Sequence, residues 1–298
     1  MSFLSFFMEV KCMDKRICWI WISRIKGIGI KKFELILNKC KSIENMWKME
    51  RNDFKYIKGI GIETINLIID KRYKTNIEKY IEYMEKNNIK IIGIDDKEYP
   101  KQLKEIYDPP IAIYVKGNIN NLNNNANVGM VGGRNCTLYG KRIAIEISEY
   151  LSKNNINIIS GLAKGIDTYS HIGCMKGKGK TIAVLGSGIN EIYPKENINL
   201  ANQIINNGGT IVSEYTLGIQ PERLNFPARN RIISGLSNKI VIIEARKKSG
   251  SIITADYALE QGKDIFVVPG NINDKFSEGS NELIKEGANI ITKYSDLI

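Results

Sequence analysis

Apolar residues recur along this chain with two different spacings. Between residues 16 and 88 they follow helical spacing, as at Phe33, Ile36 and Leu37, without the alternation that is typical of strands. Beyond residue 128, short continuous apolar runs alternate with amphipathic stretches. The pattern therefore predicts a small all-α domain followed by an α/β domain.

The second part of the chain predicts seven buried strands with helices between them. The strands are expected at residues 128–131, 156–160, 181–185, 210–213, 239–244, 265–268 and 289–292. The helices are expected at residues 139–153, 167–175, 196–206, 228–236, 251–261 and 280–285. Such alternation is typical of a parallel sheet covered by helices on both faces. Ligands of these sheets bind beyond the carboxyl ends of the strands, so we expect the functional residues in the loops that follow them.

The segment between these two parts has its own pattern. "IKIIGIDD" predicts a strand at residues 89–96, and "YPKQLKEIYDPPIAIYVKGN" predicts a short helix, a Pro-Pro turn and another strand. The polar, low-complexity stretch at residues 118–127 is interpreted as a linker, because its composition does not suit a core. A domain boundary is expected after residue 88, which gives domains at residues 1–88 and 89–298.

The letters "IKGIGI" occur at residues 25–30 and again at residues 57–62. Each copy precedes an expected amphipathic helix, and a Gly-x-Gly hairpin between helices is typical of tandem helix-hairpin-helix (SAM-like) modules, whose hairpin amides reach a DNA phosphate. The hairpins either contact DNA or only pack the domain, with Ile28 and Ile60 buried. The candidate DNA contacts are Lys26, Gly27, Gly29, Lys31, Lys32, Lys58, Gly59 and Gly61.

The net positive charge of the chain indicates the class of ligand. The 298 residues include 43 Lys and Arg against 32 Asp and Glu, a net charge of +11, which favours a polyanion such as nucleic acid or an acidic membrane surface. A general lysine excess is also typical of a solvated surface. Residues 223–248 nevertheless concentrate seven cationic side chains against one carboxylate. Phe226 lies among them, either as a platform that stacks an unpaired base or as an anchor in the core.

The loops after the expected strands are rich in Gly, Ser, Asn and basic residues, which suits the binding of phosphate by backbone amides. Neither a G-x-G-x-x-G fingerprint nor a P-loop occurs, so no nucleotide cofactor is expected. The single histidine, His171, lies in a helical stretch and is interpreted as a packed residue rather than a base. Glu214 and Glu244 each end a strand, where they either do acid–base chemistry or, as we favour, orient neighbouring loops.

Cysteine use and hydrophobicity favour a cytoplasmic protein. The five cysteines are odd in number and form no C-x-x-C pair, so neither a disulfide framework nor a metal site is predicted. The apolar run at the start is interrupted by Glu9 before it reaches signal-peptide length, and no stretch is long enough to span a membrane. The natural start is Met1, Met8 or Met13.

Seven segments in the second half resemble, in order and spacing, the DNA-processing protein A (DprA/Smf) family. They are "GGR", "SGLAKGIDTYSH", "GSGINEIYP", "SEY", "FPARNRIISGLS", "KSGSIITADYALEQGKDIFVVPG" and "GSNELIKEGA". The resemblance extends from Tyr99 to the C-terminus. It implies an extended Rossmann-like domain, a homodimer without enzymatic activity, binding of single-stranded DNA, and loading of RecA recombinase during natural transformation (competence) and recombination.

The resemblance also assigns residues to a DNA-binding site. Arg134 of "GGR" is expected to contact phosphate, Arg223 to supply a second cation, and Phe226 to stack a base. Adjoining matched positions are expected to donate to phosphate or to support the pocket floor: Gly132, Gly133, Ser160, Gly161, Lys195, Arg229, Asn230, Arg231, Lys247, Ser249 and Ser251. No winged-helix C-terminal domain, which many members carry, is expected before Ile298.

The alternative from another class is a nucleotide-processing enzyme, because Rossmann-like relatives of this fold include phosphoribohydrolases. Those enzymes place a Glu after a "PGGxGT" turn, whereas this chain has Pro269, Gly270 and Asn271 and no such Glu. A scaffold that recruits partners without binding DNA is a third alternative, against which the concentrated basic segment argues.

Overall fold

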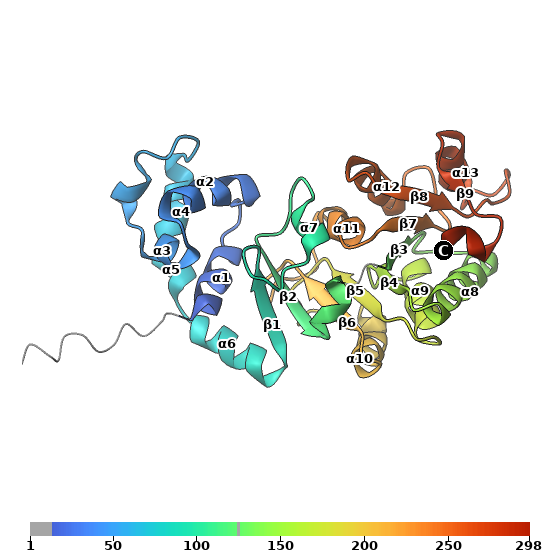
Figure 1. The fold of residues 1–298 in the computed structure, drawn as a ribbon, viewed down its shortest axis with the longest axis horizontal. Helices are drawn as coiled ribbons and strands as arrows, with labels where there is room; N and C mark the ends of the chain where they lie inside the picture. Colours follow the sequence, from blue (N-terminus) through green and yellow to red (C-terminus); the bar gives the residue numbers. More distant parts are fainter. Residues whose placement is uncertain (1–13, 124–125) are drawn as a thin grey trace, which may run out of the picture.

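The computed structural model describes residues 14–123 and 126–298, with a helical unit at one end and a sheet with its covering helices at the other (Figure 1). The helical unit consists of α1 (Lys15–Ser23), α2 (Ile30–Cys40), α3 (Ile43–Lys48), η1 (Arg51–Phe54), α4 (Ile62–Ile69), α5 (Lys71–Lys74) and α6 (Ile77–Lys86). The candidate starts, the first apolar run and Cys12 lie outside the described residues.

The two Gly-x-Gly hairpins have nearly the same backbone. The first glycine of each copy has a left-handed φ, 87° at Gly27 and 88° at Gly59, and the second glycine caps the helix that follows. The first hairpin joins α1 to α2, whereas the second joins the 3-10 helix η1 to α4. Ile28 is buried and Ile60 is half-buried, so the hairpins contribute to packing. Their contact with DNA stays a prediction.

One mixed sheet contains the nine strands that the structure describes, in the order β1-β2-β6-β5-β4-β3-β7-β8-β9. They are β1 (Ile89–Gly93), β2 (Ala112–Gly117), β3 (Asn127–Val131), β4 (Asn157–Ser160), β5 (Thr181–Leu185), β6 (Thr210–Ser213), β7 (Lys239–Ile242), β8 (Asp264–Val267) and β9 (Asn289–Ile290). The seven strands from β3 to β9 pair in parallel, as predicted. β1 and β2 add an antiparallel edge to β6, which the expectation of a parallel sheet did not include.

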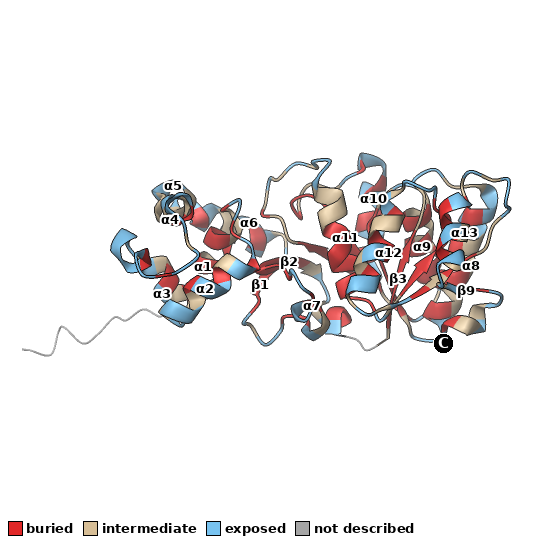
Figure 2. Cartoon of the chain, turned by 90° about the horizontal axis from the view of Figure 1, so that it is seen from above, coloured by how far each residue is buried: buried red, intermediate tan, exposed pale blue. Residues whose placement is uncertain are grey.

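Helices cover both faces of the parallel part, as expected for a Rossmann-like fold (Figure 1). They are α7 (Lys101–Lys104), α8 (Leu138–Lys153), α9 (Ile166–Cys174), α10 (Ile198–Asn206), α11 (Asn225–Gly235), α12 (Gly250–Glu260) and α13 (Glu278–Lys285), with short 3-10 helices η3 (Lys195–Asn197) and η4 (Tyr294–Leu297). Successive residues of β3 face different cores, since Met130 packs with α8 and α9 and Val131 with α11 and α12. The strands β3 to β6 are therefore fully buried, while the helices expose their outer sides (Figure 2). Both residues of the edge strand β9 are exposed, so the expectation of seven buried strands is wrong for the last one.

The helical unit packs against the antiparallel edge of the sheet, and the two share one apolar core. The Trp19 ring of α1 lies so close to Gly93 of β1 that a Cβ there would come within 1.8 Å of it. Ser23 Oγ lies 2.7 Å from the Tyr114 hydroxyl of β2. The expected boundary after residue 88 falls between α6 and β1, and independent folding of the two parts stays a prediction.

The interpretation of residues 118–127 as a linker is wrong for the part that the structure describes, residues 118–123 and 126–127. The 3-10 helix η2 (Ile119–Asn123) buries Asn121, and Asn127 begins the central strand β3. Asn121 Nδ2 donates to the Gly208 carbonyl at 2.9 Å. An asparagine side chain both donates and accepts, so it can satisfy buried backbone groups that an apolar side chain leaves unpaired. A polar composition therefore did not exclude these residues from the interior.

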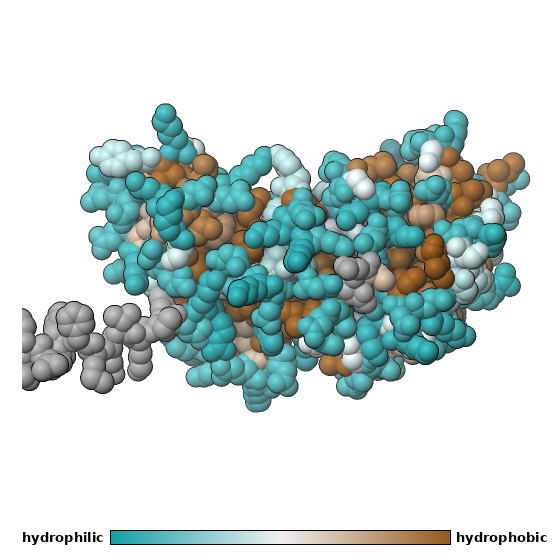
Figure 3. Space-filling model, in the orientation of Figure 1, coloured by the Kyte–Doolittle hydropathy of each residue, from teal (hydrophilic) through white to brown (hydrophobic). Residues whose placement is uncertain are grey.

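Hydrophilic side chains cover most of the face shown in Figure 3, with smaller hydrophobic areas between them. Within residues 14–123 and 126–298, no helix is long and apolar enough to cross a bilayer. The same residues contain no cluster of three or more His, Cys, Asp and Glu side chains arranged to hold a metal ion.

Candidate nucleic-acid interface

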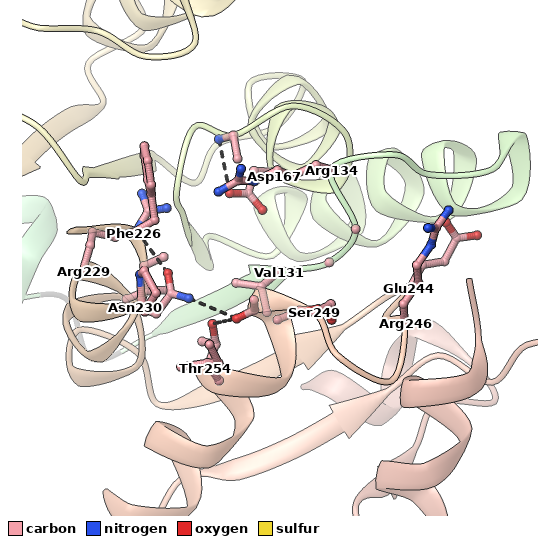
Figure 4. A pocket seen from close by; sticks show the side chains of 18 of the residues that line it. Val131, Arg134, Asp167, Phe226, Arg229, Asn230, Glu244, Arg246, Ser249 and Thr254 are labelled. Carbon is pink, nitrogen blue, oxygen red and sulfur yellow. Dashed lines mark hydrogen bonds between the residues drawn. The ribbon is translucent and has the colours of Figure 1, made fainter. Parts of the chain in front are cut away.

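A pocket of about 710 Å³ opens beyond the carboxyl ends of β3 and β7, between the first turns of α11 and α12 (Figure 4). The order of the strands reverses here: the chain runs from β3 through β4 and β5 to β6 on one side, and from β7 through β8 to β9 on the other. Ligands of open α/β sheets bind at such a switch point. The volume lies within the range of about 300–1,000 Å³ that is typical of ligand sites.

Nine of the fourteen residues that the sequence assigns to the DNA-binding site line this pocket. They are Gly132, Gly133, Arg134, Arg223, Phe226, Arg229, Asn230, Ser249 and Ser251. Lys195 and Lys247 are exposed and do not line it, although each is close in sequence to a residue that does. Ser160 is fully buried and its Oγ donates to the Met130 carbonyl at 2.7 Å, so this hydroxyl has no proton to offer a ligand.

An aromatic ring stands at one side of the pocket. Phe226, in the first turn of α11, is half-buried, and its ring centroid lies 5.6 Å from that of Tyr193 at an angle of 41°. The guanidinium of Arg134 lies 5.2 Å from the centroid of the same ring. Phe226 is thus neither a core residue nor a fully exposed one. Its position suits an aromatic surface that a planar ligand can reach.

Three arginines line the pocket with exposed side chains: Arg134 after β3, Arg223 before α11 and Arg246 after β7. We call them the rim arginines. Among the residues that the structure describes, no carboxylate forms an ion pair with any of the three. No negative charge of the described residues neutralises theirs, which leaves them available to an anionic ligand.

The floor of the pocket is built differently. The buried Arg229 of α11 donates Nη1 to the Gly161 carbonyl at 2.6 Å and to the Val184 carbonyl. Burial lowers the pKa of Arg229 to about 10, against the pull of the Asp167 carboxylate, so the guanidinium is charged at neutral pH. Gly161 is required here, because a Cβ would lie 2.4 Å from Arg229 Nη2. Arg229 therefore supports the pocket, and Gly161 lies beneath it.

Asn230, the next residue of α11, connects two walls of the pocket. Its Nδ2 donates to the Gly250 carbonyl at the start of α12 at 3.1 Å, and its Oδ1 accepts from Arg229 Nε at 3.2 Å. The Asn230 side chain therefore holds α11 and the start of α12 together, and it also fixes the Arg229 guanidinium.

Arg231 does not belong to the pocket. Its guanidinium forms two hydrogen bonds to the Glu214 carboxylate, of 2.9 and 2.6 Å, and Nε lies 3.2 Å from Asp108 Oδ2. The helix directs the side chains of residues 229 and 231 to different sides, so only the first reaches the pocket floor. Arg231 instead ties α11 to the loop after β6.

The acid–base candidates are engaged within the protein. Glu214 binds Arg231, and the buried Glu244 accepts from the backbone N–H of Thr137 at 2.9 Å and from its hydroxyl at 2.5 Å. Both carboxylates orient loops, as favoured from the sequence. His171 is fully buried beside Thr181 Oγ1, and burial together with the charge of Arg229 lowers its pKa to about 3.

Sequence reasoning left several lining residues out of the site, among them Arg246, which it counted only as part of the basic segment, and Tyr193, Asp167 and Phe276. Tyr193 lies in the matched segment "GSGINEIYP", which was a usable signal. Asp167 likewise lies in a matched segment, where its Oδ2 accepts from the backbone N–H groups of Gly161 and Ala163. Phe276 follows β8 in a segment without any matched motif, and only the fold brings it to the pocket.

The first hairpin of the helical unit lies close to the rim. Lys26 Nζ is 3.9 Å from the carboxylate of Glu222, the neighbour of Arg223 in the chain. Lys31 contacts the Tyr107 ring, and Lys32 Nζ donates to the Gly27 carbonyl at 3.1 Å. Lys58 of the second hairpin is exposed.

Comparison with known proteins places the chain in a family. Residues 90–298 match the model of DNA recombination-mediator protein A. The chain is 42% identical to DNA processing protein DprA of Bacillus subtilis over 209 residues, which cover 70% of each protein. It is 38% identical to Protein Smf of Synechocystis over 283 residues, or 94% of this chain and 71% of that protein.

Two solved structures are similar over much of their length. The X-ray structure of DNA processing protein A from Streptococcus pneumoniae has a TM-score of 0.80 and 34% identity, covering 94% of this chain and 96% of that one. A structure concerned with the single-stranded DNA binding mode of DNA processing protein A from Helicobacter pylori has a TM-score of 0.64 and 31% identity, covering 70% and 93%. The chain therefore belongs to the DNA recombination-mediator protein A (DprA/Smf) family.

Proposed function

We propose that this chain binds single-stranded DNA in the pocket at the switch point. The observation that carries the proposal is the set of rim arginines without carboxylate partners beside the accessible ring of Phe226. Phosphates of a bound strand supply the negative charge that the protein does not, and a base stacks on the ring. The Helicobacter pylori relative, whose structure concerns such binding, supports this ligand.

The same arrangement favours a single strand over a duplex. A base can enter the pocket and stack on Phe226 only if it is not already paired and stacked within a double helix. A duplex presents its phosphates to the rim arginines but keeps its bases away from the ring. Binding to a duplex is therefore expected to be weaker and to depend on charge alone.

The family resemblance supports a more specific role. We propose that the chain is not an enzyme, acts as a cytoplasmic homodimer, and passes the bound strand to RecA recombinase during natural transformation and recombination. The description of the family as a recombination mediator supports the last step. Light scattering tests the dimer, and the rate of RecA filament formation on DNA coated with single-strand-binding protein tests the loading. We also propose that residues 89–298 form a domain that carries the pocket, with residues 1–88 as a separate helical domain.

Fluorescence anisotropy with labelled oligo-dT and with a duplex of equal length, across a series of salt concentrations, tests the binding. We expect preference for the single strand, with a log–log slope of about −0.7 for each phosphate that is neutralised. Arg134→Ala is expected to weaken binding alike for all sequences, because a phosphate contact carries no sequence information. Arg142→Ala, which removes an exposed arginine of α8, is the control and should bind like the wild type.

Three results would contradict the proposal or a part of it. Equal affinity for single strand and duplex would mean that the rim arginines bind any nucleic acid through charge alone. A loss for Arg134→Ala that depends on base sequence would exclude the phosphate role of that residue. Absence of binding by the wild type would leave the nucleotide-processing alternative to be tested by a hydrolysis screen.

A further inference from the structure

The pocket contains a second pair of an arginine and an aromatic ring. The guanidinium of Arg246 lies 4.3 Å from the ring centroid of Phe276, closer than Arg134 lies to Phe226. Arg246 and Phe226 stand on opposite sides of the pocket (Figure 4). The pocket thus has one such pair at each side.

The position of Arg246 is fixed by the backbone around it. The Ala245 carbonyl accepts from the N–H groups of Gly279 and Ser280 at 2.8 and 3.2 Å, and the Ala245 N–H donates to Ser280 Oγ at 2.9 Å. These bonds attach the loop after β7 to the first turn of α13, directly after Phe276. The arginine and the ring are therefore brought together by hydrogen bonds between the loop after β7 and the start of α13.

The chemistry of this pair differs from that of a structural ion pair. Arg246 is exposed and, within the residues described, has no carboxylate partner, whereas Arg231 has two. A guanidinium that rests on an aromatic ring is held by cation–π attraction and keeps its opposite face accessible. Bases stack on guanidinium planes as they do on aromatic rings. The exposed side of Arg246 can therefore offer a second stacking surface within the pocket.

We propose that Arg246, supported by Phe276, is the platform for a second base of the same strand. This inference rests on the proposed function and deepens it: the pocket takes two nucleotides, one base on Phe226 and the other on Arg246. The role requires the planar guanidinium and not merely its charge, since a lysine ammonium carries the same charge without a plane.

The test compares Arg246→Lys with the wild type on two labelled strands of equal length, oligo-dT and a strand of abasic sugar phosphates. The abasic strand retains every phosphate but has no base to stack. We expect Arg246→Lys to weaken binding of oligo-dT about fivefold or more, to leave the abasic strand unaffected, and to keep the salt slope. Phe276→Ala should weaken oligo-dT in the same direction, because the guanidinium loses its support.

The outcomes separate this inference from the proposed function. Equal weakening on both strands would make Arg246 a phosphate contact and overturn the stacking role, as would unchanged affinity for oligo-dT. If the wild type prefers single strands and Phe226→Ala impairs it while Arg246→Lys does not, the proposed function stands and only the second base is lost. If the wild type binds no single strand, both fail. Arg142→Lys, the same substitution on α8, is the control and should match the wild type on both strands.

Discussion

The pocket has three arginines at its rim and one at its floor, and the two kinds differ in burial and in their bonding partners. The rim arginines are exposed and have no carboxylate partner in the part of the chain that the structure describes. Arg229 at the floor is 4% exposed and its guanidinium is bonded to two backbone carbonyls. One residue type thus serves two purposes, and burial decides which.

The difference follows from the cost of removing charge from water. An exposed guanidinium stays hydrated until a ligand arrives, so the fold loses nothing by leaving it without a partner. A buried guanidinium is tolerated only where hydrogen bonds and an opposite charge replace its hydration. The floor should therefore control folding and the rim should control binding.

Replacing Arg229 tests the floor and should have the largest effect. Arg229→Leu leaves two carbonyls without their donor and Asp167 without the nearby positive charge, so the free energy of unfolding should fall by about 3–5 kcal/mol. Urea denaturation measures this. Arg134→Leu at the rim is the matched control and should change stability by no more than about 0.5 kcal/mol. A loss below 1 kcal/mol for Arg229→Leu would break the distinction between floor and rim.

Phe226→Ala tests the binding role of the residues around the rim, because its ring lies against the rim arginine Arg134. If one base stacks on the ring, the free energy of binding to oligo-dT should weaken by about 1–3 kcal/mol. Anisotropy titration of a variant shown by circular dichroism to be folded measures the loss. Tyr107→Ala removes a more exposed aromatic ring that does not line the pocket, and it should bind like the wild type. Unchanged affinity of Phe226→Ala would return the ring to a packing role.

The sequence predicted the strands of the parallel part to within two residues at each end, because buried parallel strands are continuous apolar runs that need no knowledge of their neighbours. It also expected the candidate site in the loops after the strands, and residues of those loops line the pocket. It did not predict that β1 and β2 join the same sheet, since antiparallel pairing with β6 is a tertiary contact.

The candidate site was predicted in its residue types and only partly in its geometry. Arg223, Arg229 and Arg231 stand within nine positions of one another, and nothing in their order says which is exposed. The start of α11 at Asn225 decides which arginine is exposed. Arg223 precedes the helix, whereas Arg229 and Arg231 lie on its buried turns. Phe276 meets Arg246 through the attachment of α13, which is a long-range contact without a local signal.

The buried His171 makes the stability of the folded protein depend on pH. Its pKa is about 3 in the folded protein, against about 6.5 when unfolded, so the unfolded state binds the proton first as the pH falls. Stability is therefore complete above pH 6.5 and lost below it, by about 1.4 kcal/mol between pH 7.5 and 5.5. Urea denaturation at both pH values should show this loss, and His171→Gln should reduce it. A wild-type protein equally stable at both pH values would contradict the assignment.

The smallest expected effect concerns whether the DNA-binding surface extends from the pocket to the first hairpin. Lys26 of the first hairpin pairs with Glu222, which precedes Arg223 in the chain. The matching Lys58 of the second hairpin has no ion pair with the residues that the structure describes. An exposed pair such as Lys26 and Glu222 contributes little and can give way to a phosphate. On a long strand, Lys26→Ala should therefore reduce the magnitude of the salt slope by about 0.7, and Lys58→Ala should leave it unchanged. Equal reductions would mean that both hairpins contact DNA, and no reduction for either would confine binding to the pocket.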